Sequence, residues 1–547
     1  TAIGIQALQV NTSGDNNIAV GAYTLDANTT GNDNVAVGMG AMGTSTTGHE
    51  NTAVGQAALY GNTTANYNAA VGKNSLYANT TGQKNTAVGS YSLDNNTTGS
   101  YNTGIGYHAL GGNTTGGDNV AVGENCLAAN TTGGNNVAVG VGAMRDNTTA
   151  SWSTGIGREA LSENETGGNN TAIGGRALRL NVSGNSNVAI GYDALTSNTS
   201  HENVAVGRDA LASATSAQGN TAVGKGALTT ATTGAWQTAV GSYALRYLTT
   251  GARNSGFAHE AGLNITTGND NTALGYQSMK SHTTGSWNTA VGSTALYNAT
   301  TGHSNTAVGF EAVEQLTTAI SCTGVGFRAL ESNTSGPENT GLGYKAGHAI
   351  TTGHYNTCVG AYAGSYNNNI TTGHRNVMLG NYNHPSSSSG NDQICIGYNC
   401  TGQGDSTFVL GNGGTDTAIG YGSTTWVAPS DLRMKEDIVT STAGLSFIND
   451  LRPVTFKWKK EKDIPSTLNG YKEGSEKRFK TDSTELGFIA QEVKTAIDAH
   501  SEIKDGFDMW CEDESDGRQR VGETALLPVL VKAIQELSAE VNALKAK

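Results

Sequence analysis

The residues of this chain best suited to chemistry are a serine and a lysine, Ser430 and Lys435, five positions apart in the run S-D-L-R-M-K. A lysine can act as a base towards serine only if its pKa falls from about 10.4 towards 7 or 8, which requires burial or a cationic neighbour such as Arg433. The spacing alone carries little weight, because serine and lysine pairs are common. It equally fits a charged helix start that is capped by Ser430.

Other candidate groups are sparse. No carboxylate pair or histidine cluster recurs in the first 430 residues as a glycan-cutting site would require, although carboxylates from separate repeats can still converge. Six cysteines are too irregular for a disulfide framework or a zinc site, so we expect no metal and no cofactor. Cys358 and Cys395 stand where most repeats have alanine, which predicts buried apolar side chains. A Cys395–Cys400 disulfide is the weaker alternative.

Composition divides the chain near residue 430. Residues 431–547 hold 18 of the 32 Lys and Arg and 22 of the 45 Asp and Glu, but only 7 of the 75 Gly. The net charge of −13 is spread thinly and no basic run is present, so we expect no nucleic-acid partner. No stretch approaches the roughly 18 apolar residues of a membrane helix, and no signal segment starts the chain. We therefore expect no membrane insertion.

A fixed period organises the first part of the chain. Strings such as A-V-G end at Gly4 and then at steps of 17 residues up to Gly360, with one step of 16 at Gly207 and Ala258 where glycine is due. The 22 units cannot each form a core, so they must pack against their neighbours as a solenoid. At a strand spacing of about 4.8 Å, the units would stack into a rod about 105 Å long.

Each unit reads N-T-A-V-G, two variable residues, A-L and then N-T-T-G, as in residues 85–99. The alternation in T-A-V-G predicts a strand with one bulky face and one face of Ala and Gly. The face of Ala and Gly implies that another backbone approaches it closely. That backbone lies either across a narrow interior of the same chain or in a neighbouring chain, and we favour the neighbouring chain. An apolar anchor four residues after the glycine, such as Leu93, predicts a continuous core ladder.

The N-T-T-G tetrads predict tight turns in which Asn and Thr bond to nearby backbone and Gly takes a positive φ. They also spell the acceptor sequence for N-glycosylation. Turn and ladder packing explain them without a sugar, and we prefer that interpretation.

The repeats resemble the short N-x-V-A-I-G repeats in the heads of trimeric autotransporter adhesins and of some viral fibres. In those proteins three chains form parallel β-rolls around a common axis, so the resemblance implies a homotrimer. We predict a mostly β fold, an elongated parallel β-solenoid over residues 1–360. After Gly360 the period breaks, which predicts an irregular neck over residues 361–429.

The C-terminal residues 430–547 resemble the intramolecular chaperone auto-processing domain of phage tail fibres and endosialidase tailspikes. Three motifs carry the resemblance, S-D-L-R-M-K-E-D-I from Ser430, L-G-F-I-A-Q-E-V from Leu486 and A-L-L-P-V-L-V-K-A-I-Q-E-L from Ala525. The resemblance implies an α+β domain that assembles three chains, guides folding of the fibre and then cuts itself off.

The same resemblance implies a cut between Ser430 and Asp431 by a single-turnover serine autoprotease, with Ser430 and Lys435 as the catalytic pair. Attack of Ser430 on its own carbonyl would close a strained four-membered ring. Attack on a neighbouring chain, or by an activated water, is easier to draw, and cleavage in trans would make cutting wait for assembly.

The last segment, residues 525–547, has apolar residues at steps of 3 and 4, typical of a coiled-coil seam. They are Leu527, Leu530, Ile534, Leu537, Val541 and Leu544. The residue types favour two strands and the family favours three, and we follow the family because fewer than three heptads specify number poorly. The alternative is an amphipathic helix that packs on its own domain.

We therefore predict a trimeric fibre or tailspike for host attachment, found on a virion or an extracellular surface and binding an unidentified receptor or glycan. The rival prediction is a cellular surface adhesin or structural filament that uses the same C-terminal domain as a trimerisation cap. A signal peptide or outer-membrane anchor before Thr1 would favour the rival, and a virion-attachment domain would favour the fibre.

Overall fold

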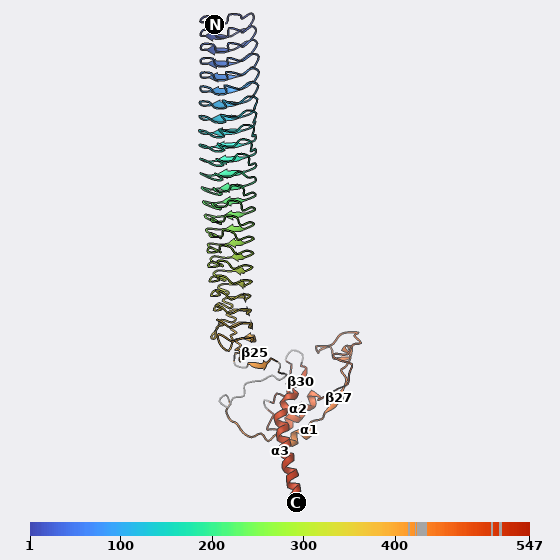
Figure 1. The fold of residues 1–547 in the computed structure, drawn as a ribbon. Coiled ribbons are helices and arrows are strands. Elements are labelled where there is room, and N and C mark those ends of the chain that lie inside the picture. The colour runs from blue at the N-terminus through green and yellow to red at the C-terminus, as the bar shows by residue number, and fades with distance from the viewer. Residues whose placement is uncertain (414–415, 422, 424–434, 505–506, 514–516) are drawn as a thin grey trace. The chain divides into compact units, whose positions relative to one another are not determined.

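The computed structural model describes residues 1–413, 416–421, 423, 435–504, 507–513 and 517–547. The chain divides into two compact units, Thr1–Pro429 and Ser430–Lys547. The first unit is a stack of similar coils, as Figure 1 shows. No helix among the described residues is long and apolar enough to cross a membrane.

Each coil of the first unit contributes one short strand, which pairs in parallel with the strands of the adjacent coils, as in Thr154↔Thr171. Among the described strands of this unit, β26 alone pairs in antiparallel orientation, with β25. The predicted parallel β-solenoid and its 17-residue period are confirmed. The strands are β1 Ala2–Ile3, β2 Ile18–Val20, β3 Val35–Val37, β4 Thr52–Val54, β5 Ala69–Val71, β6 Thr86–Val88, β7 Thr103–Ile105, β8 Val120–Val122, β9 Val137–Val139, β10 Thr154–Ile156, β11 Thr171–Ile173, β12 Val188–Ile190, β13 Val204–Val206, β14 Thr221–Val223, β15 Thr238–Val240, β16 Ser255–Phe257, β17 Thr272–Leu274, β18 Thr289–Val291, β19 Thr306–Val308, β20 Thr323–Val325, β21 Thr340–Leu342, β22 Thr357–Val359, β23 Val377–Leu379, β24 Ile394–Tyr398, β25 Thr407–Asn412 and β26 Thr417–Gly420.

The solenoid interior is filled by the middle residue of each strand and by the anchors. Ala87 and Leu93 in one coil are fully buried, and their equivalents repeat along the stack. The anchor ladder is therefore confirmed as the core. The prediction that the Ala and Gly face meets a neighbouring chain is wrong, because that face points into the chain's own narrow interior, where only a small side chain fits beside the anchor.

A ladder of buried asparagines precedes the strands. The side-chain amide of Asn119 donates to the carbonyl of Gly133 at 2.9 Å, and its Oδ1 accepts the backbone N–H of Asn136 at 3.0 Å. A second ladder is formed by the asparagines of the N-T-T-G turns, such as Asn113, whose amide donates to Gly116 and to Asn96 of the preceding coil. These amides are buried, which supports turn packing over glycosylation.

The prediction that the glycines of the N-T-T-G turns take a positive φ is wrong. The tetrad glycine Gly99 has no positive φ, and it is small because a Cβ there would lie 2.4 Å from the carbonyl oxygen of Gly116 in the next coil. Positive φ belongs to the strand-end glycines such as Gly89, at 132°, and to non-glycine residues such as the anchor Leu93, at 53°. Left-handed residues recur because they aim the backbone N–H along the axis, as Leu93 does towards Ala109 at 3.0 Å.

In some coils a smaller residue at the anchor position is accompanied by a larger residue at the turn-asparagine position. Where the anchor is glycine, as at Gly262, the turn asparagine is replaced by a larger residue, Ile265, and both are part of the buried interior. A Cβ on Gly262 would lie 2.9 Å from the Cδ1 of Ile265, so a side chain at position 262 would require Ile265 to shift. The same exchange recurs further along the chain, at Gly347 with Ile350 and at Gly364 with Ile370.

The ladder does not stop at Gly360, where an irregular neck was expected. Strands β22, β23, β24 and β25 continue to pair in parallel. The period changes because the coil that follows β22 is longer, so that Thr357 pairs with Val377, 20 residues later. The additional residues are accommodated while the strand register is kept.

The second unit is a small α+β domain. Its helices are α1 Leu445–Asp450, α2 Ala490–Ala499 and α3 Leu526–Lys545, with 3-10 turns η2 Glu461–Asp463 and η3 Glu523–Ala525. Two antiparallel pairs complete it, β27 Val454–Phe456 with β28 Glu485–Gly487, and β29 Trp510–Glu512 with β30 Gln519–Val521. Its core gathers residues from all three helices, among them Phe447, Val493 and Val529.

Replacement of Ala258 by glycine should stabilise the shaft. Ala258 is the one repeat position where alanine replaces the strand-end glycine, and it adopts a φ of 108°. Such a conformation costs about 1–3 kcal/mol in a residue with a Cβ, which exceeds the roughly 0.4–1 kcal/mol by which glycine stabilises the unfolded chain. We expect Ala258→Gly to raise the unfolding free energy by about 1 kcal/mol, measured by denaturant titration.

The matched control is Ala239→Gly, in the middle of β15, where the backbone is extended and the side chain is buried. There the same chemical change should destabilise the shaft. Equal effects of the two substitutions would contradict the assignment of strain to Ala258.

A buried histidine should make shaft stability depend on pH. His282 occupies a turn-asparagine position, where Nε2 lies 2.9 Å from the carbonyl oxygen of Gly285 and Nδ1 has no partner among the described residues. Burial lowers the pKa of His282 below its ordinary value. The unfolded chain therefore binds a proton that the folded chain does not, and stability falls as pH drops below about 6.5.

We expect His282→Asn, which restores the residue of most coils, to reduce this loss. The check compares melting temperatures of the two proteins between pH 7.5 and 5. Parallel pH profiles would contradict the assignment to His282.

Candidate functional site

The expected catalytic residues are only partly visible. Ser430, Asp431 and Arg433 lie outside the described residues, so the structure gives no geometry for the proposed cut. Lys435 is described and its side chain is exposed. Residues 435–444 form no helix, and α1 begins at Leu445. The burial that a lysine base requires is therefore not supplied to Lys435 by the described part of its own chain.

The other two family-like motifs meet in the core of the second unit. The motif from Leu486 spans the end of β28 and the start of α2, and the motif from Ala525 covers the end of η3 and most of α3. Val493 and Ile497 from α2 and Leu526 and Val529 from α3 belong to one buried cluster with Phe447 of α1. The motifs thus include residues that hold the three helices together.

Helix α3 has two apolar faces. Leu526, Val529 and Ala533 are buried in its own unit. The residues of the predicted seam lie on the adjacent face of α3 and are largely exposed in the single chain, so α3 packs on its own unit through one face and leaves the next one uncovered. The exposed fractions are 63% for Leu527, 37% for Leu530, 65% for Ile534, 49% for Leu537, 40% for Val541 and 70% for Leu544.

A carboxylate on α3 fixes the start of α1. Glu536 accepts the backbone N–H of Leu445 at 2.8 Å and pairs with Lys532 at 3.3 Å. The hydrogen bond from Leu445 is the main cause of the lowered pKa of Glu536. The first N–H groups of a helix lack internal partners and favour negative charge, so this contact orients α1 against α3. No sequence spacing indicates a bond between residues this far apart.

A histidine joins the ends of α1 and α2. His500 Nε2 lies 2.8 Å from a carboxylate oxygen of Asp450, and Nδ1 lies 3.1 Å from Glu502. These bonds, chiefly the one to Asp450, raise the pKa of His500. The arrangement links the ends of the two helices, and sequence reasoning missed it.

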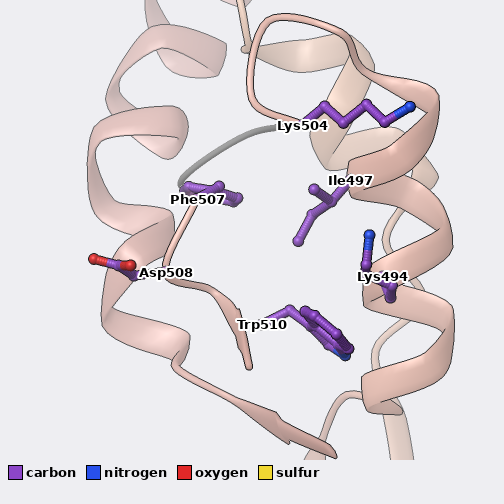
Figure 2. A pocket seen from close by; sticks show the side chains of 6 residues that line it. All are labelled: Lys494, Ile497, Lys504, Phe507, Asp508 and Trp510. Atoms are coloured by element: carbon purple, nitrogen blue, oxygen red, sulfur yellow. The ribbon is translucent and has the colours of Figure 1, made fainter. Parts of the chain in front are cut away.

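The second unit also contains a cavity of about 220 Å³, shown in Figure 2. Its walls come from the end of α2 and the segment that leads into β29. Lys494 reaches over Trp510, 5.1 Å from the ring centroid, and forms an ion pair with Asp498. The described lining residues do not include Lys435, and they are Lys494, Ile497, Lys504, Phe507, Asp508 and Trp510.

The shaft surface carries exposed aromatic side chains. Phe310, Phe327 and Tyr344 stack on successive coils with ring centroids 5.5 and 5.2 Å apart. Stacked rings of this kind stabilise adjacent coils. Trp152 is 66% exposed, and Trp287, which meets the ring of His303 edge-on, is 64% exposed.

Two clusters of potentially reactive side chains, three glutamates and two cysteines, are explained by contacts within the shaft and need no bound metal or disulfide. The carboxylates of Glu311, Glu314 and Glu331 lie within 4.8 Å of one another, and Arg328 pairs with two of them. Cys395 and Cys400 are free buried thiols in the structure, and a hydrogen bond between them raises the pKa of Cys395. Cys358 is also fully buried, in agreement with its predicted role as interior filler.

Comparison with known proteins is informative for the second unit alone. No curated protein and no solved structure matches the chain. The family model described as chaperone of endosialidase matches residues 430–501. The match supports the intramolecular chaperone domain expected there. Together with the β-solenoid, it supports a tail-fibre-like or tailspike-like protein that carries a C-terminal chaperone.

Proposed function

We propose that this chain is the shaft and assembly unit of a homotrimeric host-attachment fibre or tailspike. In this proposal residues 430–547 bring three chains together, guide folding of the shaft and then detach by cutting between Ser430 and Asp431. Ser430 is the nucleophile and Lys435 is the base. The shaft itself is not an enzyme.

The observation that carries assembly is the exposed seam of α3. A single chain gains nothing from six apolar side chains held in water at steps of 3 and 4, while their burial between helices stabilises a coiled coil. The adjacent face of α3 is already used for the core of its own unit. The seam is therefore available for other copies without unfolding the domain.

Cleavage in trans fits the exposure of Lys435 in one chain. A neighbouring chain would supply the burial that lowers the pKa of the lysine, so the catalytic pair would become active only after assembly. This order protects unassembled chains from losing their chaperone.

Host attachment is the part of the proposal supported by the shaft surface. Aromatic residues with a polar edge, such as Trp152 and Trp287, are enriched at binding surfaces, and both are largely exposed here. A cellular surface adhesin would use the same surface.

Replacement of the nucleophile should abolish cutting. We expect the denaturing intact mass of the wild type to show the fragments 1–430 and 431–547, and Ser430→Ala to remain whole. Lys435→Arg keeps the positive charge but cannot act as a base at neutral pH, so it should also remain whole. A wild type that assembles and stays uncut would show that the second unit is a permanent cap.

Charges in the seam should prevent assembly. We expect Leu530→Glu with Ile534→Glu to convert a three-chain species into single chains in sedimentation velocity, because carboxylates would be buried without partners. Helix content should change little, since these side chains do not pack on their own unit. The control is Gln535→Glu, on an exposed position outside the seam, and an unchanged mass for the double variant would contradict the seam.

A further inference from the structure

The outward side of the strands forms a continuous surface along the shaft, which we call the outer face. It consists of the first and third residues of each strand from β2 to β24, for example Thr171 and Ile173 of β11. The strands lie one above another in the stack, as Figure 1 shows, so these side chains form two parallel rows. The middle residues of the same strands face the interior.

The outer face contains no charged residue and no amide from β2 to β24, a stretch that is described in full. It is built from Thr, Val, Ile and Leu with single Ala, Ser and Phe residues. Charges are frequent directly beside it. The residue that follows the strand-end glycine is charged in five coils, as at Lys73 and Glu124. The residue two before the strand is charged in eight others, as at Asp33 and Arg253.

Strand propensity does not account for this exclusion. Thr, Val and Ile are favoured in strands, but a sheet with one solvated face normally carries polar and charged side chains on that face. The repeats of this chain vary freely at other exposed positions. Exclusion at the outer face in one coil after another indicates that water does not cover it in the working protein.

The exposed apolar area is large enough for a stable interface. The third residue of each strand is well exposed in many coils. Val88, Ile105, Leu274 and Leu342, for example, are between 39% and 45% exposed. Over all coils this row leaves on the order of 1,000 Å² of side chain exposed, more than the about 800 Å² that each partner contributes to a standard interface. Monomers rarely expose a continuous apolar patch of that size.

We propose that the outer face packs against further copies of this chain, in parallel and with the same coils level. A partner must present apolar side chains that repeat about every 4.8 Å along roughly 100 Å of shaft, which is the spacing between strands. Another copy of this chain presents such side chains in every coil. This inference rests on the proposed homotrimer and names the shaft surface that makes it. The face of inner alanines is excluded from that role because it lies inside the coil.

Cysteine cross-linking of the assembled full chain tests the surface. Cys511 is the one exposed cysteine of the six, all of which are described, so the background variant is Cys511→Ser. In that background we compare Ile173→Cys on the outer face with Ser183→Cys, an exposed residue in the turn of the same coil. Mild oxidation should give a disulfide-linked pair of chains for Ile173→Cys and none for Ser183→Cys.

A second pair of variants makes the test independent of disulfide geometry. Ile173→Lys should lower the melting temperature of the assembled shaft by several degrees, and Ser183→Lys should leave it unchanged. If the wild type is trimeric but neither outer-face variant has its effect, this inference is overturned and the proposed assembly stands. A single-chain wild type in native mass measurement overturns both.

Discussion

Every coil of the shaft must close its backbone hydrogen bonds on the coils above and below it, and the rest of the structure depends on this constraint. Buried N–H and C=O groups need partners, and a coil with only a three-residue strand cannot supply them internally. The turns therefore bond along the axis as the strands do, for example from Tyr91 back to Lys73 and from Leu93 on to Ala109. Left-handed backbone at both residues aims their N–H groups in these directions.

Close stacking then decides which side chains are allowed where. Strand-end glycines approach the next coil so closely that a Cβ on Gly89 would lie 2.4 Å from a carbonyl oxygen. The interior is narrow, and in the coil of Gly262 and Ile265 a larger turn residue occurs together with a missing anchor side chain. Exposed turn positions are free of this constraint, which is why charges and aromatic rings collect there. The outer face is exposed in one chain and yet restricted, so its restriction has a different source.

The sequence was sufficient to predict the period, the strand, the anchor ladder and the position of the α3 seam, because each follows from spacing alone. It did not reveal which face of T-A-V-G points inward, since strand alternation defines two faces but closure of the coil chooses between them. The φ values of the turns were also mispredicted, because they follow from axial hydrogen bonds rather than from local glycine preference. At the candidate site the sequence identified Ser430 and Lys435 by resemblance, but it gave no indication of the long-range contacts of Glu536 and His500.

The shaft has a charge-free outer face, and α3 has an apolar seam that its own domain leaves uncovered. In the proposed trimer, both features have the same physical meaning, that apolar surface exposed in one chain would be covered by the others. The most direct measurement is the mass per unit length of the shaft in unstained electron micrographs. Three chains side by side predict three times the linear mass density of one solenoid. The linear mass density of a single solenoid would contradict the account, even if the C-terminal units were found to associate.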